Sequence, residues 1–218
     1  MSDSVDPPLV DRGFLGSGRI FLVPSVDRSG ARGRLLEVAR RRFATDGAIA
    51  ATLDEIRRDA DVSVGAMYHH FPDKPALAAA VYAQVMGEYQ AGFLAMLRRH
   101  ATAQGGIRGG VAHHLRWVVA NRSEAALLLG DRLDSAELRD SNREFFAAVR
   151  DWWRPHHSYG ALRPMQAGIT AALWFGPAQE FSRYWIAGDE PRMPRGVATT
   201  FADAAWKALR ANDIEEDD

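Results

Sequence analysis

The chain has 218 residues, of which 47% are hydrophobic and 25% are charged, and its formal net charge is −1 at pH 7. This length accommodates one small domain and one larger domain with its own core. The sequence has no cysteine, which excludes disulfides, thiolate catalysis and cysteine-based zinc fingers. No apolar run reaches the length of a membrane span, so we expect a cytoplasmic protein without a membrane partner.

The two ends of the chain differ in composition from the rest. Residues 1–30 contain prolines and glycines without helical periodicity, so we expect a flexible arm that carries no secretion signal. Its arginines could contact DNA beside a reading helix, as arms of other DNA-binding folds do. Residues 212–218 hold five acids and are expected to form a disordered tail; without these acids the net charge of −1 would become +4. Arginines also concentrate in the first third of the chain, where they raise the local positive potential.

A helix-turn-helix is predicted within residues 31–76. Thr52 and Glu55 have the spacing of a capping box, which places the start of a helix at Thr52. Asp61 follows this helix, and Asp tolerates the left-handed backbone geometry that ends one. Ser63 is a second N-cap candidate and would begin another helix after only a few residues. Two short helices joined this tightly form a helix-turn-helix.

The second of these helices carries the surface that we expect to contact DNA. Met67 and Phe71 are four residues apart and face inward. The opposite face has small residues near the N-terminus of the helix and hydrogen-bonding residues near its C-terminus. Lys74 lies near the positive end of the following helix, a position that favours phosphate. The candidate DNA-binding residues are Thr52, Ser63, Val64, Gly65, Ala66, Tyr68, His69, His70 and Lys74. Alternatively, Thr52 and Ser63 serve only as caps, one histidine only packs against its neighbours, or the segment is an ordinary amphipathic hairpin.

The run VSVGAMYHHFPDKPAL over residues 62–77 closely resembles the signature of the tetracycline-repressor (TetR) family, V-S-x-G-x-L-Y-x-H-F-x-x-K-x-x-L. The resemblance covers about residues 32–80, and four residues upstream fit the first helix of the family and its closing glycine: Leu36, Ala39, Phe43 and Gly47. Two positions depart from the family pattern. Arg57 stands where the family usually has Ala, and either contacts phosphate or is solvated; Asp61 replaces the usual Gly of the turn.

This resemblance implies an all-α fold, with an N-terminal three-helix helix-turn-helix DNA-binding domain and a larger C-terminal helical bundle domain. For the larger domain, over residues 77–211, the apolar spacing predicts a long helix from Leu77 that Gly105 and Gly106 end or interrupt. Further helices are expected over 107–118, before Pro155, over 165–186 with a kink at Gly176 and Pro177, and over 197–208.

Large side chains with polar tips along these helices predict a pocket for an apolar or amphipathic small molecule. Its candidate lining is Tyr89, Phe93, Met96, His114, Trp117, Phe146, Trp153, Trp174 and Gln179. The alternative is that these residues only fill the core. The adjacent histidines at 113–114 and 156–157 do not predict a metal site, because neighbours on a helix point apart. We expect no cofactor.

A homodimer is expected because a two-fold dimer presents two reading helices to a pseudo-palindromic operator in double-stranded DNA. In the family that the chain resembles, the last two long helices form the seam between subunits. The candidate seam residues are Gly168, Ala172, Phe175, Phe201, Ala205 and Ala208. The alternative is that they line the core of the single subunit.

These features predict a homodimeric transcriptional repressor that leaves its operator when a ligand favours a conformer with wrongly spaced reading helices. The helix from Leu77 to about His100 would couple ligand binding to release of the operator. The alternative is a DNA-binding regulator without a ligand, controlled by a protein partner or by concentration. The sequence has no nucleophile elbow, phosphate loop or suitably spaced carboxylate pair, so we do not expect an enzyme.

Overall fold

The computed structural model describes residues 30–45, 50–130, 135–188, 190 and 192–211. Apart from Gly30, the predicted N-terminal arm lies outside these residues, as do Gly47 and the acidic tail. The described residues form nine helices: α1 (Ala31–Thr45), α2 (Leu53–Asp59), α3 (Val64–His70), α4 (Lys74–Leu97), α5 (Ala103–Ala120), α6 (Arg122–Leu129), α7 (Ala136–Ser158), α8 (Ala167–Ala187) and α9 (Val197–Leu209). Among them, none is both long and apolar enough to cross a membrane.

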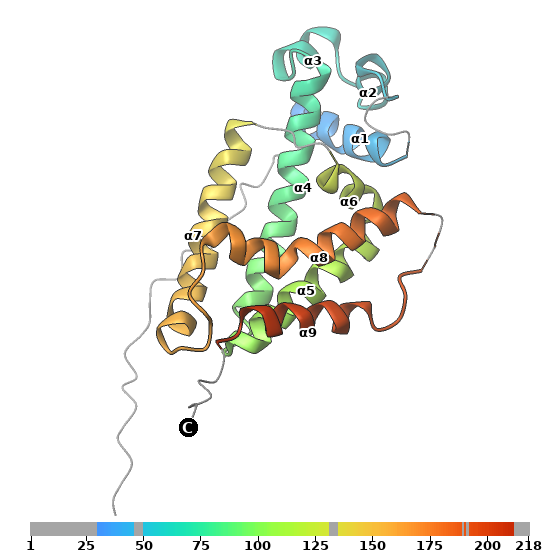
Figure 1. The fold of residues 1–218 in the computed structure, drawn as a ribbon. Helices are drawn as coiled ribbons and strands as arrows, with labels where there is room; N and C mark the ends of the chain where they lie inside the picture. Colours follow the sequence, from blue (N-terminus) through green and yellow to red (C-terminus); the bar gives the residue numbers. More distant parts are fainter. Residues whose placement is uncertain (1–29, 46–49, 131–134, 189, 191, 212–218) are drawn as a thin grey trace, which may run out of the picture.

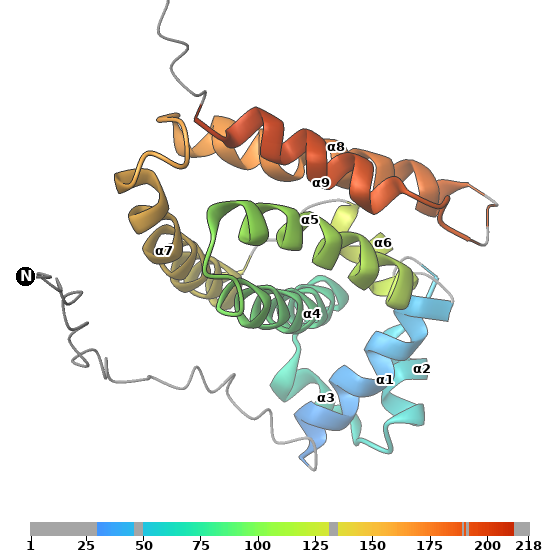
Figure 2. The same ribbon diagram turned by 90° about the horizontal axis from the view of Figure 1, so that it is seen from below.

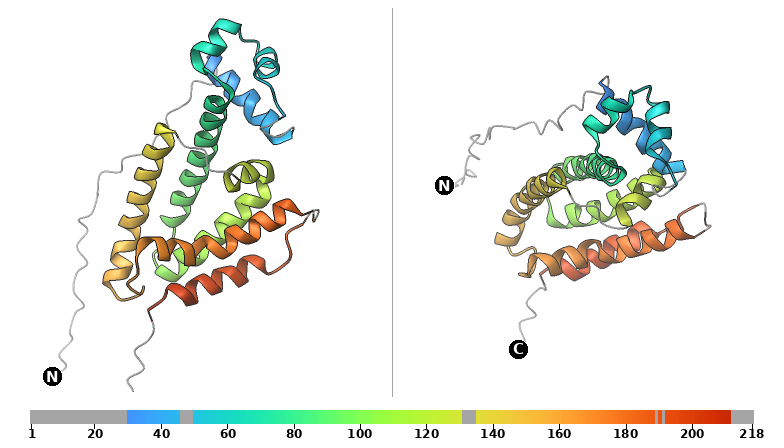
Figure 3. Two further views of the ribbon diagram at one scale, coloured as in Figure 1. Left: turned by 45° about the horizontal axis from the view of Figure 1, so that its top comes forward. Right: turned by 90° about the horizontal axis from the view of Figure 1, so that it is seen from above.

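The helices form a small N-terminal unit and a larger bundle (Figure 1). Helices α1 to α3 gather around one end of α4, which runs on into the bundle with α7 beside it. Helix α5 lies between α4 and the neighbouring pair α8 and α9 (Figures 2 and 3). The predicted fold class, an all-α chain with a helix-turn-helix followed by a larger helical domain, is confirmed.

The glycines of α5 serve packing rather than termination, so the predicted break at Gly105 and Gly106 was wrong. Helix α4 ends earlier, at Leu97, and α5 begins at Ala103 with Thr102 as its cap. A Cβ on Gly106 would overlap the ring of Trp152, and one on Gly110 would lie 3.0 Å from the ring of Trp174. Glycine therefore lets large rings lie directly against the α5 backbone, a tertiary requirement that offsets its low helix propensity.

The end of one helix and the presence of another also differ from prediction. Helix α7 continues through Pro155 to Ser158, because the proline lies in the last turn and Trp152 packs against His156 across it, with ring centroids 4.5 Å apart. Helix α8 includes Pro177, as the single helix predicted over 165–186 requires. Helix α6 was not predicted at all: it is only eight residues long, and its N-cap Asn121 makes no side-chain capping bond.

Arg122 binds the start of helix α6 to the end of α8. The Arg122 guanidinium lies 4.3 Å from the centroid of the Trp185 ring. It donates hydrogen bonds of 2.8–3.2 Å to the carbonyls of Trp185, Ile186, Gly188 and Glu190. One arginine therefore binds two carbonyls of the last turn of α8 and two of the residues that follow it, at a helix end where the dipole also favours a cation.

The N-terminal unit and the bundle are joined through a shared core. The buried residues of α1 to α3 form one cluster with Leu77, Val81 and Val85 of α4, and Leu127 and Leu128 of α6 pack against it. A half-buried ion pair adds to this contact: Arg40 of α1 donates to the Glu88 carboxylate at 2.8 Å and to Glu124 at 3.4 Å. The orientation of α1 is thus tied to both α4 and α6.

Candidate nucleic-acid interface

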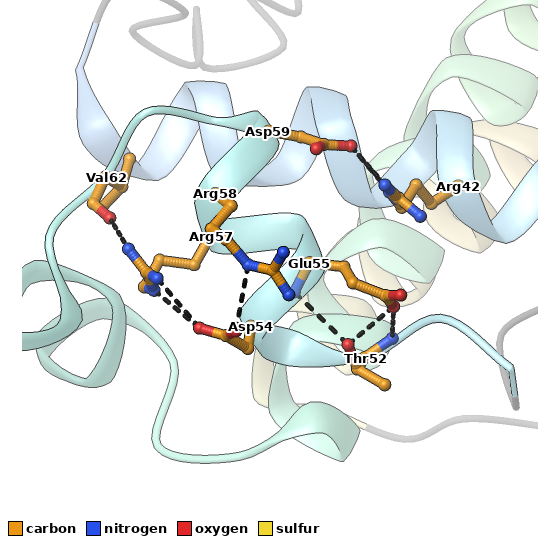
Figure 4. A network of polar contacts seen from close by, with 8 residues as sticks. All are labelled: Arg42, Thr52, Asp54, Glu55, Arg57, Arg58, Asp59 and Val62. Carbon is orange, nitrogen blue, oxygen red and sulfur yellow. Dashed lines mark hydrogen bonds and ion pairs between the residues drawn. The ribbon is translucent and has the colours of Figure 1, made fainter.

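Helix α2 begins with the capping box expected from the sequence. The backbone N–H of Glu55 donates to the Thr52 hydroxyl at 3.3 Å, and the N–H of Thr52 donates to the Glu55 carboxylate at 3.0 Å (Figure 4). The Thr52 hydroxyl also donates its hydrogen to the same carboxylate at 2.6 Å, and these bonds hold the pKa of Glu55 below its usual value. Thr52 is therefore an N-cap of α2, and its contact with phosphate stays a prediction.

The turn between α2 and α3 is held by Arg57, the residue that departs from the family pattern. Asp61 has a φ of 50°, the left-handed geometry expected for it. The Arg57 guanidinium donates to the Val62 carbonyl at 3.1 Å and to the Asp54 carboxylate at 2.9 Å (Figure 4). Arg57 and then Arg58 keep the pKa of Asp54 low. Arg57 is therefore not merely solvated, because its hydrogen bonds fix the turn; its contact with phosphate stays a prediction.

Arginines of α1 fix the other side of α2. The Arg34 side chain donates to the carbonyls of Ala60 at 3.0 Å and Asp61 at 3.3 Å, and Arg42 pairs with Asp59 at 2.6 Å. Several of the arginines that suggested a strongly positive N-terminal third are therefore neutralised by carboxylates or used as caps. The basic potential of this unit is weaker than the count of arginines indicates.

Helix α3 presents the predicted reading face to solvent. Met67 and Phe71 are buried in the N-terminal core, whereas Val64 and Tyr68 are each 56% exposed. Gly65 and His69 are also exposed on that side. We call Val64, Gly65, Tyr68 and His69 the α3 surface. A Cβ on Gly65 would meet nothing within 4 Å, so the fold itself does not require glycine there.

The remaining candidates border the α3 surface. The Ser63 hydroxyl accepts a hydrogen bond from the Ala66 N–H at 3.2 Å and is an N-cap. Ala66 is half-buried against the core. The half-buried His70 packs its ring on Phe71, with centroids 6.5 Å apart. Lys74 is the first residue of α4, at the positive end of that helix.

A small cavity of about 60 Å³ lies in the bundle between α4, α5, α6 and α8. Four of the predicted pocket residues line it, namely Tyr89, His114, Trp117 and Gln179. Met86, Val118, Leu128 and Leu129 complete the lining. The two leucines belong to α6, the helix that sequence periodicity did not reveal, and no local signal could have placed them at this cavity.

The other five predicted pocket residues do not line the cavity: Phe93, Met96, Phe146, Trp153 and Trp174. Trp174 is buried and donates to the Ile107 carbonyl at 2.9 Å. Its ring lies 5.6 Å from that of Trp153 and 5.9 Å from that of Phe93, in the same core as Met96. Phe146 is instead 51% exposed on α7. Four of these residues thus pack in the core around the α5 glycines, as expected if they only fill the core, and the fifth, Phe146, lies on the surface.

A chain of buried polar groups borders the cavity. The Tyr89 hydroxyl lies 3.2 Å from His114 Nδ1, and His114 Nε2 lies 3.3 Å from the Ser182 hydroxyl. Burial, helped by the charges of His113 and Arg183, lowers the pKa of His114 to about 4, and burial raises the pKa of Tyr89. Both side chains are therefore neutral at pH 7. Ser182 was missed at the sequence level, because its role depends on α8 meeting α5.

The candidate seam residues divide into two groups. Gly168 and Ala172 are exposed on α8. Phe175 stacks on Trp174 at 4.8 Å, Ala205 is buried, and Phe201 packs against Phe181 at 5.4 Å. Ala205 belongs to the core of the chain itself, so we remove it from the seam. Phe175 and Phe201 are half-buried and pack against that core, and Ala208 is half-buried, so their place in the seam stays a prediction. The exposed apolar residues of α8 are instead Ile169, Leu173 and Tyr184.

Comparison with known proteins agrees with this arrangement. Residues 35–81 match the family model described as bacterial regulatory proteins, tetR family. No curated protein matches the sequence.

Solved structures share the fold at low sequence identity. A TetR family transcription regulator from Marinobacter aquaeolei VT8 is 17% identical, with a TM-score of 0.67 over 84% of this chain and 96% of that one. A tetR-family regulatory protein from Rhodococcus RHA1 is 23% identical, with a TM-score of 0.64 over 84% and 98%. The regulator FadR from Bacillus subtilis, in complex with stearoyl-CoA, is 16% identical, with a TM-score of 0.63 over 79% and 96%. Residues 35–81 are thus an N-terminal domain of the tetR family of bacterial regulatory proteins, and the whole chain shares the fold of the solved structures above.

Proposed function

We propose that this transcriptional regulator is a homodimeric repressor that reads a pseudo-palindromic operator with the α3 surface of each subunit. The exposure of that surface carries the proposal: Val64 and Tyr68 are large side chains that are each 56% exposed on a helix capped at its start and packed through Met67 and Phe71. A rigid exposed face of this kind suits contact with base edges, while Tyr68 and Lys74 suit phosphates.

The dimer would form through the exposed side of α8. Ile169, Leu173 and Tyr184 are 50%, 37% and 78% exposed and lie on one side of the helix together with Ala172. An apolar strip of this kind on a helix surface favours a partner helix, and a two-fold arrangement would pair it with its own copy. In such a dimer, α8 lies away from α3, so both reading helices remain open to DNA (Figure 1).

The seam is tested by placing a charge on it. Ile169→Glu should convert the dimer to a monomer, because two carboxylates would be buried without partners. Val119→Glu is a matched control, since Val119 is 48% exposed on a different helix. Sedimentation should show a dimer for the native chain and the control, and a monomer for Ile169→Glu. A dimer that survives Ile169→Glu would place the seam elsewhere.

Operator binding is tested by selecting sequences from a random duplex library and measuring affinity against salt concentration. Lys74→Ala should weaken binding to all sequences and reduce the salt slope by about one for each phosphate that the lysine neutralises. His69→Ala should change sequence preference more than overall affinity, because His69 lies on the base-facing side. If the selected sequences have no two-fold symmetry, the proposed dimeric reading is wrong.

We further propose that a small molecule controls this binding. The FadR complex with stearoyl-CoA means that a protein of this fold can hold a ligand. In the present chain, Met86 and Leu128 line the cavity, and Glu88 and Glu124 on the same two helices pair with Arg40 of α1. A ligand that moved α4 or α6 would therefore move α1 and the spacing of the reading helices.

The alternative is a regulator without a ligand, controlled by a partner or by concentration. The close packing of the aromatic core and the small size of the cavity favour it. A compound screen read by thermal shift and by operator release separates the two candidates. Stabilisation follows from binding the folded chain, whereas release follows only from preference for the non-binding conformer.

A further inference from the structure

The hydrogen positions along the buried polar chain follow from its geometry. Ser182 Oγ lies 2.8 Å from the Ala178 carbonyl, and because a carbonyl oxygen can only accept, the Ser182 hydrogen must point to it. The Ser182 oxygen is then an acceptor for His114, so Nε2 carries the hydrogen of this neutral imidazole. His114 Nδ1 is therefore bare, and the Tyr89 hydroxyl donates to it across 3.2 Å.

This order leaves defined polar groups for a molecule in the cavity. The Tyr89 hydrogen is committed to His114, so only the lone pairs of the Tyr89 oxygen remain, and they accept. Gln179 also lines the cavity, and its amide makes no hydrogen bond to the residues that the structure describes. Both nitrogens of His114 are already in use. The side chains that line the cavity thus offer the Tyr89 oxygen as an acceptor, the Gln179 amide as both donor and acceptor, and the Trp117 indole N–H as a donor.

Among the described residues, those that line the cavity carry no carboxylate, guanidinium or ammonium group. Arg183, whose positive charge helps to lower the pKa of His114, does not line the cavity: its side chain is exposed and donates to the Leu129 carbonyl at 3.0 Å and the Glu180 carboxylate at 2.9 Å. A charged ligand group would lose its hydration in the cavity without meeting an opposite charge, which is costly.

From this geometry we infer that the cavity takes an uncharged, mostly apolar molecule with one hydroxyl or N–H group, which donates to the Tyr89 oxygen and pairs with the Gln179 amide. This inference rests on the proposed ligand response and names the chemical class of the ligand. It excludes carboxylates and phosphates as the group held at the polar end. The rest of the molecule would contact Met86, Trp117 and Leu128.

Small monosubstituted benzenes are suitable probes. A cavity of about 60 Å³ is smaller than the roughly 150 Å³ that holds benzene in an engineered protein core, so a ring must displace part of the lining. Met86 is the side chain best able to move, because its thioether chain is unbranched and flexible. Phenol, toluene and benzoate have similar shape and differ at pH 7 in one group, which is hydroxyl, methyl or carboxylate.

The test measures dissociation constants of the three probes for the full chain by NMR titration, following the indole N–H of Trp117. Phenol should bind at least about tenfold more tightly than benzoate, because the carboxylate finds no cation. Gln179→Leu should weaken phenol binding about fivefold and leave toluene binding unchanged or stronger, since it removes one neutral hydrogen bond. Gln104→Leu, an exposed change on α5, is the control and should alter neither.

Three results would overturn the inference: benzoate binding as tightly as phenol, Gln179→Leu weakening phenol and toluene by the same factor, or no binding by any probe near its solubility limit. Operator affinity is measured on the same samples. If phenol binds as expected but operator affinity stays unchanged, the ligand class stands and the proposed coupling fails. If the probes fail while the native chain still binds a two-fold operator, the proposed DNA function stands and the ligand class is wrong.

Discussion

Gly65 provides the sharpest test of the α3 surface, because its replacement should affect stability and DNA binding in opposite directions. Gly65 is the second residue of α3, is exposed, and has open space within 4 Å of where a Cβ would lie. Gly65→Ala should therefore stabilise the fold by about 0.5 kcal/mol, less than the full glycine-to-alanine difference because the position is near the helix end. For a chain of this size that corresponds to a rise in melting temperature of about 1–2 °C.

The same methyl group should weaken operator binding. If the start of α3 approaches base edges closely, the methyl has to displace DNA or side chains in a packed interface, and inserting one methyl into such a contact costs about 1–3 kcal/mol. Affinity should then fall by about 5-fold to 150-fold, since 1.4 kcal/mol is a factor of ten.

Fluorescence anisotropy with the selected operator and a thermal melt of the same sample measure both quantities. Gly87→Ala is the control: it lies within α4, also has open space around a Cβ, and is remote in sequence from the α3 surface. It should raise the melting temperature and leave operator affinity unchanged. A Gly65→Ala chain that is more stable and binds its operator as tightly as the native chain would show that α3 does not approach DNA at this point.

Three further expectations concern stability. In denaturant titrations, Arg57→Ala should lower the free energy of unfolding by about 1–2 kcal/mol, because it removes the hydrogen bonds that hold the turn. The control is Arg58→Ala, which should lower it by less than about 0.5 kcal/mol, because the Arg58 side chain is 62% exposed and pairs with Asp54 at the surface. Equal losses would contradict the role given to Arg57. Arg122→Lys should lower the free energy of unfolding by about 1–3 kcal/mol, since lysine cannot both reach four carbonyls and stack on Trp185. An unchanged melting temperature would refute the capping role. His114 has a folded pKa of about 4, below its ordinary value of 6.5, so the folded state resists protonation, and stability should decline by up to about 3 kcal/mol as pH falls from about 6.5 to 4. This part of the decline should be absent in His114→Gln, and identical pH profiles for the two chains would refute it.

The helix-turn-helix could be predicted from the sequence because its signals are local. A capping box joins residues three apart, the left-handed backbone at Asp61 depends on one residue, and Ser63 caps the helix that it begins. The inward side of α3 followed from the four-residue spacing of Met67 and Phe71. Such interactions act within one or two helical turns, so the printed order of residues already specifies them.

The cavity and the exposed side of α8 depended on the tertiary structure. Trp117 and Trp174 are equally plausible pocket residues in sequence, but only the first lines the cavity, because Gly110 lets the second lie against α5. Ser182 acquires its role only where α8 meets His114. Helix periodicity determines that a side chain faces inward, whereas the helix it meets there depends on packing between segments far apart in the chain, which no local spacing encodes.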